Sequence, residues 1–218
     1  MEIQSVYQLS QNTKRSLWVV GIFLLVLIAD QALKFYIKLN YTLGEAHEVL
    51  PFFQLCFVEN DGMAFGIEWF SKLLLTLFRI IAVGLFAWYL HVLIYKQQSR
   101  MGYIVMVTLV AAGALANILD CLFYGMIFSQ STPWEVATLF PAEGGYAPFF
   151  YGKVVDMLYF PLIHNSAGEV LFFRPVFNLA DSCITVAVIV IFIFFRKDLD
   201  RSLSKGKQDE EVKEDKKK

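Results

Sequence analysis

Four stretches of about twenty mostly apolar residues are the feature that most limits the folds open to this chain. They cover about residues 17–37, 73–95, 103–128 and 177–195. A helix that crosses the hydrocarbon core of a bilayer needs about 20 such residues. The composition points the same way, because only 18% of the 218 residues are charged, against about 25% in soluble domains. The chain is predicted to be an all-α membrane protein with four transmembrane helices.

The basic residues set the expected orientation of these spans. They gather before the first span, between the second and third spans, and after the fourth: Lys14, Arg15, Lys96, Arg100, Arg196, Lys197 and Arg201. The connection over residues 40–71 holds five acids and no base, and residues 129–170 hold four acids and one lysine. Because cytoplasmic loops carry the excess of Lys and Arg, both termini are predicted to be cytoplasmic.

The two predicted outer loops, residues 40–71 and 129–174, are too long to be simple connectors. Residues 45–68 are rich in β-branched and aromatic residues, so we expect a small β-rich extracytoplasmic segment between the first two spans. The second loop carries aromatic residues that favour the membrane interface: Trp134, Tyr146, Phe149, Phe150 and Tyr151. One membrane domain is predicted over residues 1–201, followed by a disordered charged tail over 202–218.

Three carboxylates interrupt the predicted spans at similar depth. Asp30, Asp120 and Asp181 each lie 13 to 17 residues from the cytoplasmic end of their span, or roughly 20–26 Å at 1.5 Å per residue. In a core of about 30 Å, this depth is its outer third. Intramembrane acids are costly and therefore candidates for function, so the shared depth predicts one polar site just inside the outer surface.

The spacing of the polar residues adds detail to this site. Asn117 and Asp120 are i,i+3, as are Asn178 and Asp181, so each pair shares one helix face. Both asparagines could instead only bond neighbouring helices. Asp30 and Lys34 are i,i+4, which favours a structural ion pair over a catalytic role. Asp156 lies outside the spans, but its apolar neighbours indicate an acid that dips back toward the membrane.

The sequence gives no support for metal binding, another cofactor or a nucleic-acid partner. None of the three histidines has metal-ligand spacing, and Cys56, Cys121 and Cys183 are too far apart for a metal motif, so no metal or other cofactor is expected. A net charge of −1 without a basic run argues against a nucleic-acid partner. A small proton-coupled transporter using the intramembrane acids, and a non-enzymatic scaffold whose polar residues join helices, remain as alternatives. Asp→Asn variants would separate them, since each class loses a different property.

Five short motifs follow one another along the chain: D-Q-x-x-K at residues 30–34, N-x-G-x-A-F at 60–65, G-x-x-x-N-x-x-D at 113–120, G-x-V-V-D at 152–156 and F-N-x-A-D-S at 177–182. In sequence and order they resemble those of the lipoprotein signal peptidases (signal peptidase II). The resemblance covers about residues 17–195.

The resemblance implies an aspartic endopeptidase of the bacterial cytoplasmic (inner) membrane with its active site near the outer face. It would remove the signal peptide from diacylglyceryl-modified prolipoproteins by cutting just before the lipidated Cys, as a monomer in contact with membrane lipid and sensitive to globomycin-type inhibitors. The family's catalytic pair carries over to Asp156 and Asp181, which the residues alone did not separate from Asp120 with Asp181. Supporting or substrate-binding positions would be Asp30, Lys34, Asn60, Gly62, Asn117, Asp120, Asn178 and Ala180.

Two departures from the family pattern stand out. Position 121, directly after Asp120, is Cys where relatives usually carry Arg, so an ionic role at this position must be filled by another group or not at all. Thirty-five residues separate Asp120 from Asp156, where relatives have only a few. This insertion, over about residues 121–152, is expected to enlarge the outer rim of the site.

Overall fold

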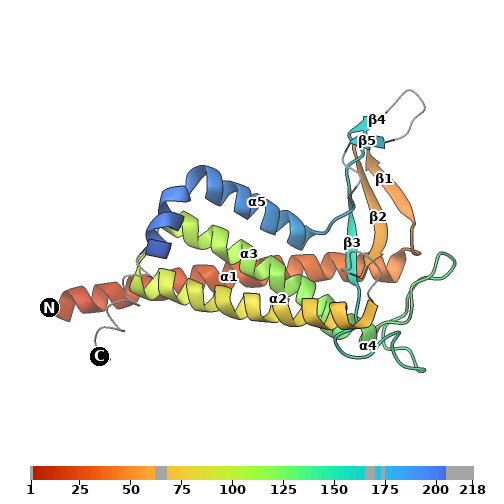
Figure 1. The fold of residues 1–218 in the computed structure, drawn as a ribbon, viewed down its shortest axis with the longest axis horizontal. Helices are drawn as coiled ribbons and strands as arrows, with labels where there is room; N and C mark the ends of the chain where they lie inside the picture. Colours follow the sequence, from red (N-terminus) through yellow and green to blue (C-terminus); the bar gives the residue numbers. More distant parts are fainter. Residues whose placement is uncertain (1, 62–67, 165–169, 173–174, 205–218) are drawn as a thin grey trace.

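The computed structural model describes residues 2–61, 68–164, 170–172 and 175–204. Four long helices run along one axis of the molecule, and a small sheet stands at one end of them (Figure 1). The helices are α1 (Glu2–Asn40), α2 (Glu68–His91), α3 (Met101–Leu119) and α5 (Leu179–Phe194). Two short π-helical turns, η1 (Val92–Lys96) and η2 (Asp120–Tyr124), extend α2 and α3, and a single turn, α4 (Gly125–Ile127), follows η2.

Three of these helical segments are long and apolar enough to cross a membrane: Ser10–Asn40, Lys72–Lys96 and Met101–Ile127. A fourth candidate is α5 together with a helix over Arg196–Ser204, which is bent by 85° from α5. The described part of the chain is therefore mostly helical, with three to four candidate spans. The fourth span is shorter than expected, because α5 begins only at Leu179, after the capping residue Asn178.

Helix α3 occupies the centre of the bundle and packs against α1, α2 and α5. Its small residues permit this close approach: Ala111, Ala112, Gly113 and Ala116. A Cβ atom at Gly113 would lie 2.6 Å from the carbonyl oxygen of Ala180, so only glycine lets the first turn of α5 lie this close. The packing brings the polar residues of α3 and α5 together.

The sheet combines both outer loops. Strands β1 (Ala46–Leu50) and β2 (Phe53–Asn60) form a hairpin, and β3 (Val154–Tyr159) pairs antiparallel with the other edge of β2. This confirms the small β-rich segment between the first two spans. The third strand was not predicted: Asp156 lies on β3, opposite Val58. A separate two-stranded ribbon joins β4 (Ile163–His164) and β5 (Val170–Phe172).

The insertion folds back onto the end of α3. The backbone NH groups of Gly152 and Ala147 each donate to a carbonyl oxygen of this helical end, those of Cys121 and Gly125, at 2.9 Å. The Trp134 side chain is 88% exposed, as expected for a residue at the membrane interface. Tyr146 differs from that expectation, because it packs against the buried core and its hydroxyl accepts from the backbone NH of Lys153.

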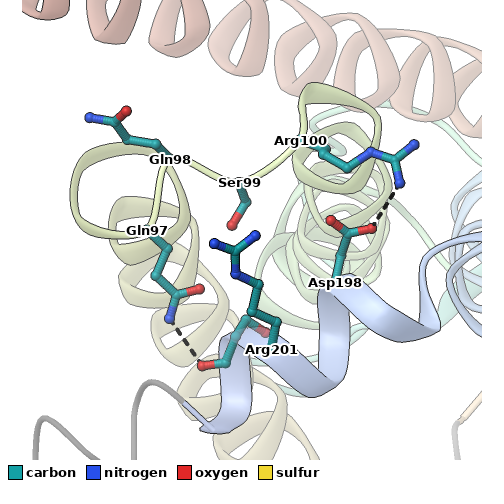
Figure 2. A pocket seen from close by; sticks show the side chains of 7 residues that line it. Gln97, Gln98, Ser99, Arg100, Asp198 and Arg201 are labelled. Atoms are coloured by element: carbon teal, nitrogen blue, oxygen red, sulfur yellow. Dashed lines mark hydrogen bonds and ion pairs between the residues drawn. The ribbon is translucent and has the colours of Figure 1, made fainter.

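The opposite end of the bundle holds the helix over Arg196–Ser204. Arg100 Nη1 pairs with Asp198 Oδ2 at 3.3 Å, and Gln97 Nε2 donates to the Ser202 carbonyl at 3.0 Å (Figure 2). These contacts border a polar cavity of about 120 Å³ into which Arg201 also projects. The helix thus includes Ser202–Ser204, where disorder was expected, and the rest of the predicted tail lies outside the described residues.

Candidate active site

Asn178 connects three elements at the sheet end of the bundle. As the N-cap of α5, its side-chain oxygen accepts from the backbone NH of Asp181 at 2.9 Å, the usual way a helix start is satisfied. Its amide nitrogen donates to Asp156 Oδ1 at 2.7 Å and to Asn117 Oδ1 at 3.1 Å. One side chain therefore fixes β3, α3 and the start of α5 relative to one another.

Two carboxyl groups flank this asparagine. Asp156 is only 3% exposed, and its second oxygen accepts from Asn60 Nδ2 at 3.2 Å. Asp181 Oδ1 accepts from Asn117 Nδ2 at 2.8 Å. Burial, followed by the negative charge of Asp181, raises the pKa of Asp156 from 3.8 to about 6. The two carboxyls are thus close enough for the charge of Asp181 to disfavour the ionisation of Asp156.

Lys34 is fully buried near this pair and contacts two further acids. Its ammonium group is 2.9 Å from Asp30 Oδ2 and 2.6 Å from Asp120 Oδ2. The same group donates to Asn117 Oδ1 at 2.8 Å. Asp30 in turn accepts from the backbone NH of Ala180 at 2.8 Å. This buried ionic triad joins α1 to α3 and to the first turn of α5.

We call the connected set the carboxylate cluster: Asp30, Lys34, Asn117, Asp120, Asp156, Asn178 and Asp181. Its charged members are four carboxyls and one ammonium group. Among the described residues, Asp156 and Asp181 have amide donors but no ion-pair partner. An excess of buried acid with little base favours retention of a proton, so this pair can hold one charged and one neutral carboxyl.

The structure brings together nearly all of the residues expected at the site. Asn60 also reaches it, through Asp156. Ala180 contributes its backbone NH rather than its side chain, and Gly62 lies outside the described residues. Gln31 belongs to the first motif but was not singled out, although its amide donates to Asp120 Oδ1 at 2.8 Å and its oxygen accepts from the Tyr124 hydroxyl at 3.0 Å.

A second buried polar group was missed entirely. Lys38, one turn after Lys34, forms an ion pair with Glu59 and donates to Ser131 Oγ at 2.8 Å. Lys153 approaches the other oxygen of Glu59 at 3.5 Å. We call these four residues the anchor cluster, because they tie the insertion to α1 and β2. The i,i+4 spacing of Lys34 and Lys38 was the available signal, but Lys38 falls in the last turn of α1, beyond the predicted span.

Contact between a serine and a lysine raises the question of nucleophilic catalysis, in which the lysine acts as a base. Here both side chains are buried, and the Lys38 ammonium lies 5.0–5.7 Å from the ring centres of Phe57, Phe128 and Tyr146. Such rings stabilise a cation, as does the ion pair with Glu59. Lys38 is therefore engaged by Glu59, Ser131 and the surrounding rings, which favours a structural role over that of a free base.

Fold and site together define a multi-pass membrane protein with a paired-carboxylate site at one end of its helix bundle. The family model for Signal peptidase (SPase) II matches residues 22–196, and the chain belongs to this family. It is an aspartic peptidase family, so the chain is an enzyme.

Relatives and solved structures agree with this assignment. A lipoprotein signal peptidase of Porphyromonas gingivalis is 44% identical over 186 residues, covering 81% of this chain and 82% of the relative. A lipoprotein signal peptidase of Amoebophilus asiaticus is 32% identical over 207 residues, covering 88% of this chain and 84% of the relative. A solved structure described as a bacterial membrane enzyme superposes with a TM-score of 0.60 at 25% identity, over 83% of this chain and 93% of that chain.

Proposed function

We propose that this chain removes the signal peptide from diacylglyceryl-modified prolipoproteins with Asp156 and Asp181 as its catalytic pair. Membership of the signal peptidase II family supplies the activity, the removal of signal peptides from prolipoproteins. The observation that carries the residue assignment is the position of Asn178, which bonds the Asp156 carboxyl and the backbone NH of Asp181 with one side chain.

The chemistry follows from one proton shared by two carboxyls. The charged carboxylate takes a proton from a water molecule as its oxygen attacks the scissile carbonyl, and the neutral carboxyl donates its proton to the developing oxyanion. Collapse of the tetrahedral intermediate breaks the C–N bond, and a proton passes to the leaving amine. The products are the free signal peptide and the lipoprotein with an amino-terminal lipidated Cys, with no covalent intermediate.

The environment favours Asp156 as the carboxyl that holds the proton. Its raised pKa, caused by burial and by the nearby Asp181, keeps the neutral form the more stable one up to about pH 6. Asp181, at the start of α5, benefits from the positive end of the helix dipole, which stabilises an anion. In this assignment Asp181 activates the water and Asp156 protonates the oxyanion.

The remaining residues of the carboxylate cluster support this pair. The ionic triad of Asp30, Lys34 and Asp120 fixes α1, α3 and α5 without direct contact with substrate, since all three side chains are fully buried. Asn60 holds the second oxygen of Asp156. Gly62, two residues after Asn60 in the sequence, keeps the substrate-binding role that its motif implies.

In the proposed topology the chain crosses the bacterial cytoplasmic membrane four times, α5 being the fourth span, with both termini in the cytoplasm. The pair then lies near the outer face, where exported prolipoproteins arrive, and the diacylglyceryl chains stay in lipid between the helices. Phe-rich outer surfaces suit this contact, and the chain acts as a monomer. Reporter fusions at Lys96–Arg100 should read cytoplasmic, and fusions near Gly144 should read external.

The decisive test is cleavage of a synthetic diacylglyceryl prolipoprotein peptide by the purified protein in detergent. We expect cut products ending just before the lipidated Cys, insensitivity to EDTA, and inhibition by globomycin. The same peptide without the lipid is the control. Absence of cleavage by a folded protein, or loss of activity with EDTA that zinc restores, would overturn the aspartic peptidase assignment.

A further inference from the structure

Within the part of the chain that the structure describes, Arg79 is an intramembrane cation without an ionic partner. It lies seven residues inside the Lys72–Lys96 span, or about 10 Å along the helix, and its side chain is only partly exposed. Charged side chains at such depth normally pair with one another or mark a functional site. Among the described residues no carboxylate lies within ion-pair distance of Arg79, and its hydrogen-bond acceptor is Cys121 Sγ at 3.4 Å.

The Cys121 thiol does not satisfy this guanidinium. A thiol sulfur is a weak acceptor, whereas arginine presents five N–H donors in a planar fork. Cys121 is itself buried and directly follows Asp120. Arg79 therefore holds several donors, without protein acceptors among the described residues, beside the carboxylate cluster.

The α2 face that carries Arg79 makes two contacts next to residues of the carboxylate cluster. Lys72, Thr76 and Arg79 are spaced i,i+4,i+7 and share one face of the helix. At the N-terminal end of this face, Lys72 forms an ion pair with Asp61 at 2.9 Å. Asp61 follows Asn60, which bonds the catalytic Asp156. The face thus extends from the end of β2, beside one catalytic carboxyl, to position 121, beside the ionic triad.

We infer that Arg79 is a substrate-positioning residue that donates hydrogen bonds to backbone carbonyl groups of the signal peptide. This rests on the proposed function. A peptide drawn into the membrane in an extended form carries carbonyl oxygens with no water to bond them, and a guanidinium fork can bond two such oxygens at once. The sequence lacks the arginine expected at position 121, and the structure supplies a guanidinium to the same place from α2.

The test compares Arg79→Gln with Arg79→Lys in the cleavage assay. Loss of hydrogen bonds from a charged donor corresponds to roughly a 10- to 100-fold change in a binding constant or in kcat/KM. We expect Arg79→Gln to lower kcat/KM by about that factor, mainly through a higher KM, and Arg79→Lys to recover part of the loss as a single point donor. Arg100→Gln, at the opposite end of the bundle, is the matched control and should behave as the parent.

A relocated arginine makes the test specific. In the Arg79→Gln background, Cys121→Arg should restore most of the lost kcat/KM, because it returns a guanidinium to the same place from η2. Binding of a fluorescent lipidated peptide to the cleavage-deficient Asp181→Asn protein, with and without Arg79→Gln, measures the contact without catalysis. A roughly 10-fold or larger weakening is expected there as well.

Two results would overturn the inference, and a third would separate it from the proposed function. Unchanged KM and unchanged binding in Arg79→Gln would mean that the side chain only extends toward lipid headgroups. A loss confined to kcat, or matched by a fall in melting temperature, without rescue by Cys121→Arg, would mean a structural role. If the parent protein bound the lipidated peptide through Arg79 but did not cleave it, the proposed function would fail while the positioning role stood.

Discussion

Helix α1 carries two buried lysines one turn apart, and the two clusters around them differ in charge balance. Around Lys38, the anchor cluster pairs two ammonium groups with Glu59, and Lys153 also approaches the neighbouring Asp61 at 3.9 Å. Around Lys34, the carboxylate cluster sets one ammonium group against four carboxyls. The helix, the depth and the degree of burial are similar, so the charge balance distinguishes them.

This difference separates a structural role from a chemical one. Where each buried ion has a partner of opposite charge, as Lys38 and Glu59 do, removal of one partner should damage the fold. Where acids outnumber bases, as beside Asn178, burial and like charge raise the pKa of a carboxyl and favour retention of its proton. Perturbed acids of this kind are typical of active sites. The comparison makes opposite predictions for the two clusters, and each can be tested.

The largest effect should come from the uncompensated pair. Asp156→Asn and Asp181→Asn each remove either the acid or the base, so the cleavage rate should fall by about 10³-fold or more while the protein stays folded and inserted. Asp198→Asn, which changes an acid at the opposite end of the bundle, should retain activity. Full activity in either variant of the catalytic pair would remove that residue from the mechanism.

Breaking the compensated cluster should instead cost stability. Lys38→Met leaves Glu59 buried with a weaker partner, and such a loss destabilises proteins by about 3–5 kcal/mol. The measurement is unfolding in detergent followed by circular dichroism. Adding Glu59→Gln to Lys38→Met removes the uncompensated charge and should recover much of the loss. An unchanged melting temperature in the single variant would show that Lys153 alone balances Glu59.

The pH dependence of stability gives a third test. The second test expects a substitution to lower the stability of the protein, whereas this one expects a substitution to raise it. The folded pKa of Asp156 is about 6 against the ordinary 3.8, so ionising this group costs the native state more than the unfolded chain. No cost exists below pH 3.8, the cost grows between pH 3.8 and 6, and above pH 6 it reaches about 3 kcal/mol.

Asp156→Asn never ionises and should therefore be more stable than the parent at pH 8 and equal to it near pH 4. The gain should fall short of the full 3 kcal/mol, because Asn60 and Asn178 both donate to the carboxylate and one of them would face the new amide nitrogen. Equal melting temperatures at both pH values would mean that Asp156 is ionised at little cost.

The smallest effect is expected at Ser131. It accepts from Lys38 and donates to Glu59 at 2.9 Å, so Ser131→Ala removes about 1 kcal/mol of hydrogen bonding and leaves the ion pair. Cleavage should stay within about threefold of the parent, as measured by initial rates. A loss comparable to that of the dyad variants would reveal a serine–lysine mechanism and reverse the roles given to the two clusters.

The sequence predicted the site better than its surroundings. Helical spacing and shared depth were enough to group Asp30, Asp120 and Asp181, because both follow from fixed helix geometry. The strand position of Asp156 was not predictable, since pairing between β2 and β3 joins segments almost a hundred residues apart.

The contacts that depend on packing were missed for the same reason. The cage of rings around Lys38 and the contact between Arg79 and Cys121 join separate elements, and no local pattern encodes them. The π-turn η2 also shifts the residues after Asp120 relative to a regular helix, which the sequence did not indicate.

The N-cap of α5 has a consequence for how the enzyme responds to different membranes. With 16 residues, α5 spans about 24 Å, less than a typical hydrocarbon core, and such mismatch is relieved by changes in tilt or local bilayer thickness. Asp181 moves with α5, whereas Asp156 belongs to the sheet. Because Asn178 is bonded to both and lies at the start of the helix, we expect it to act as the pivot if α5 tilts. The separation of the two acids should therefore vary little with acyl-chain length, which makes the geometry of the pair robust to hydrophobic mismatch.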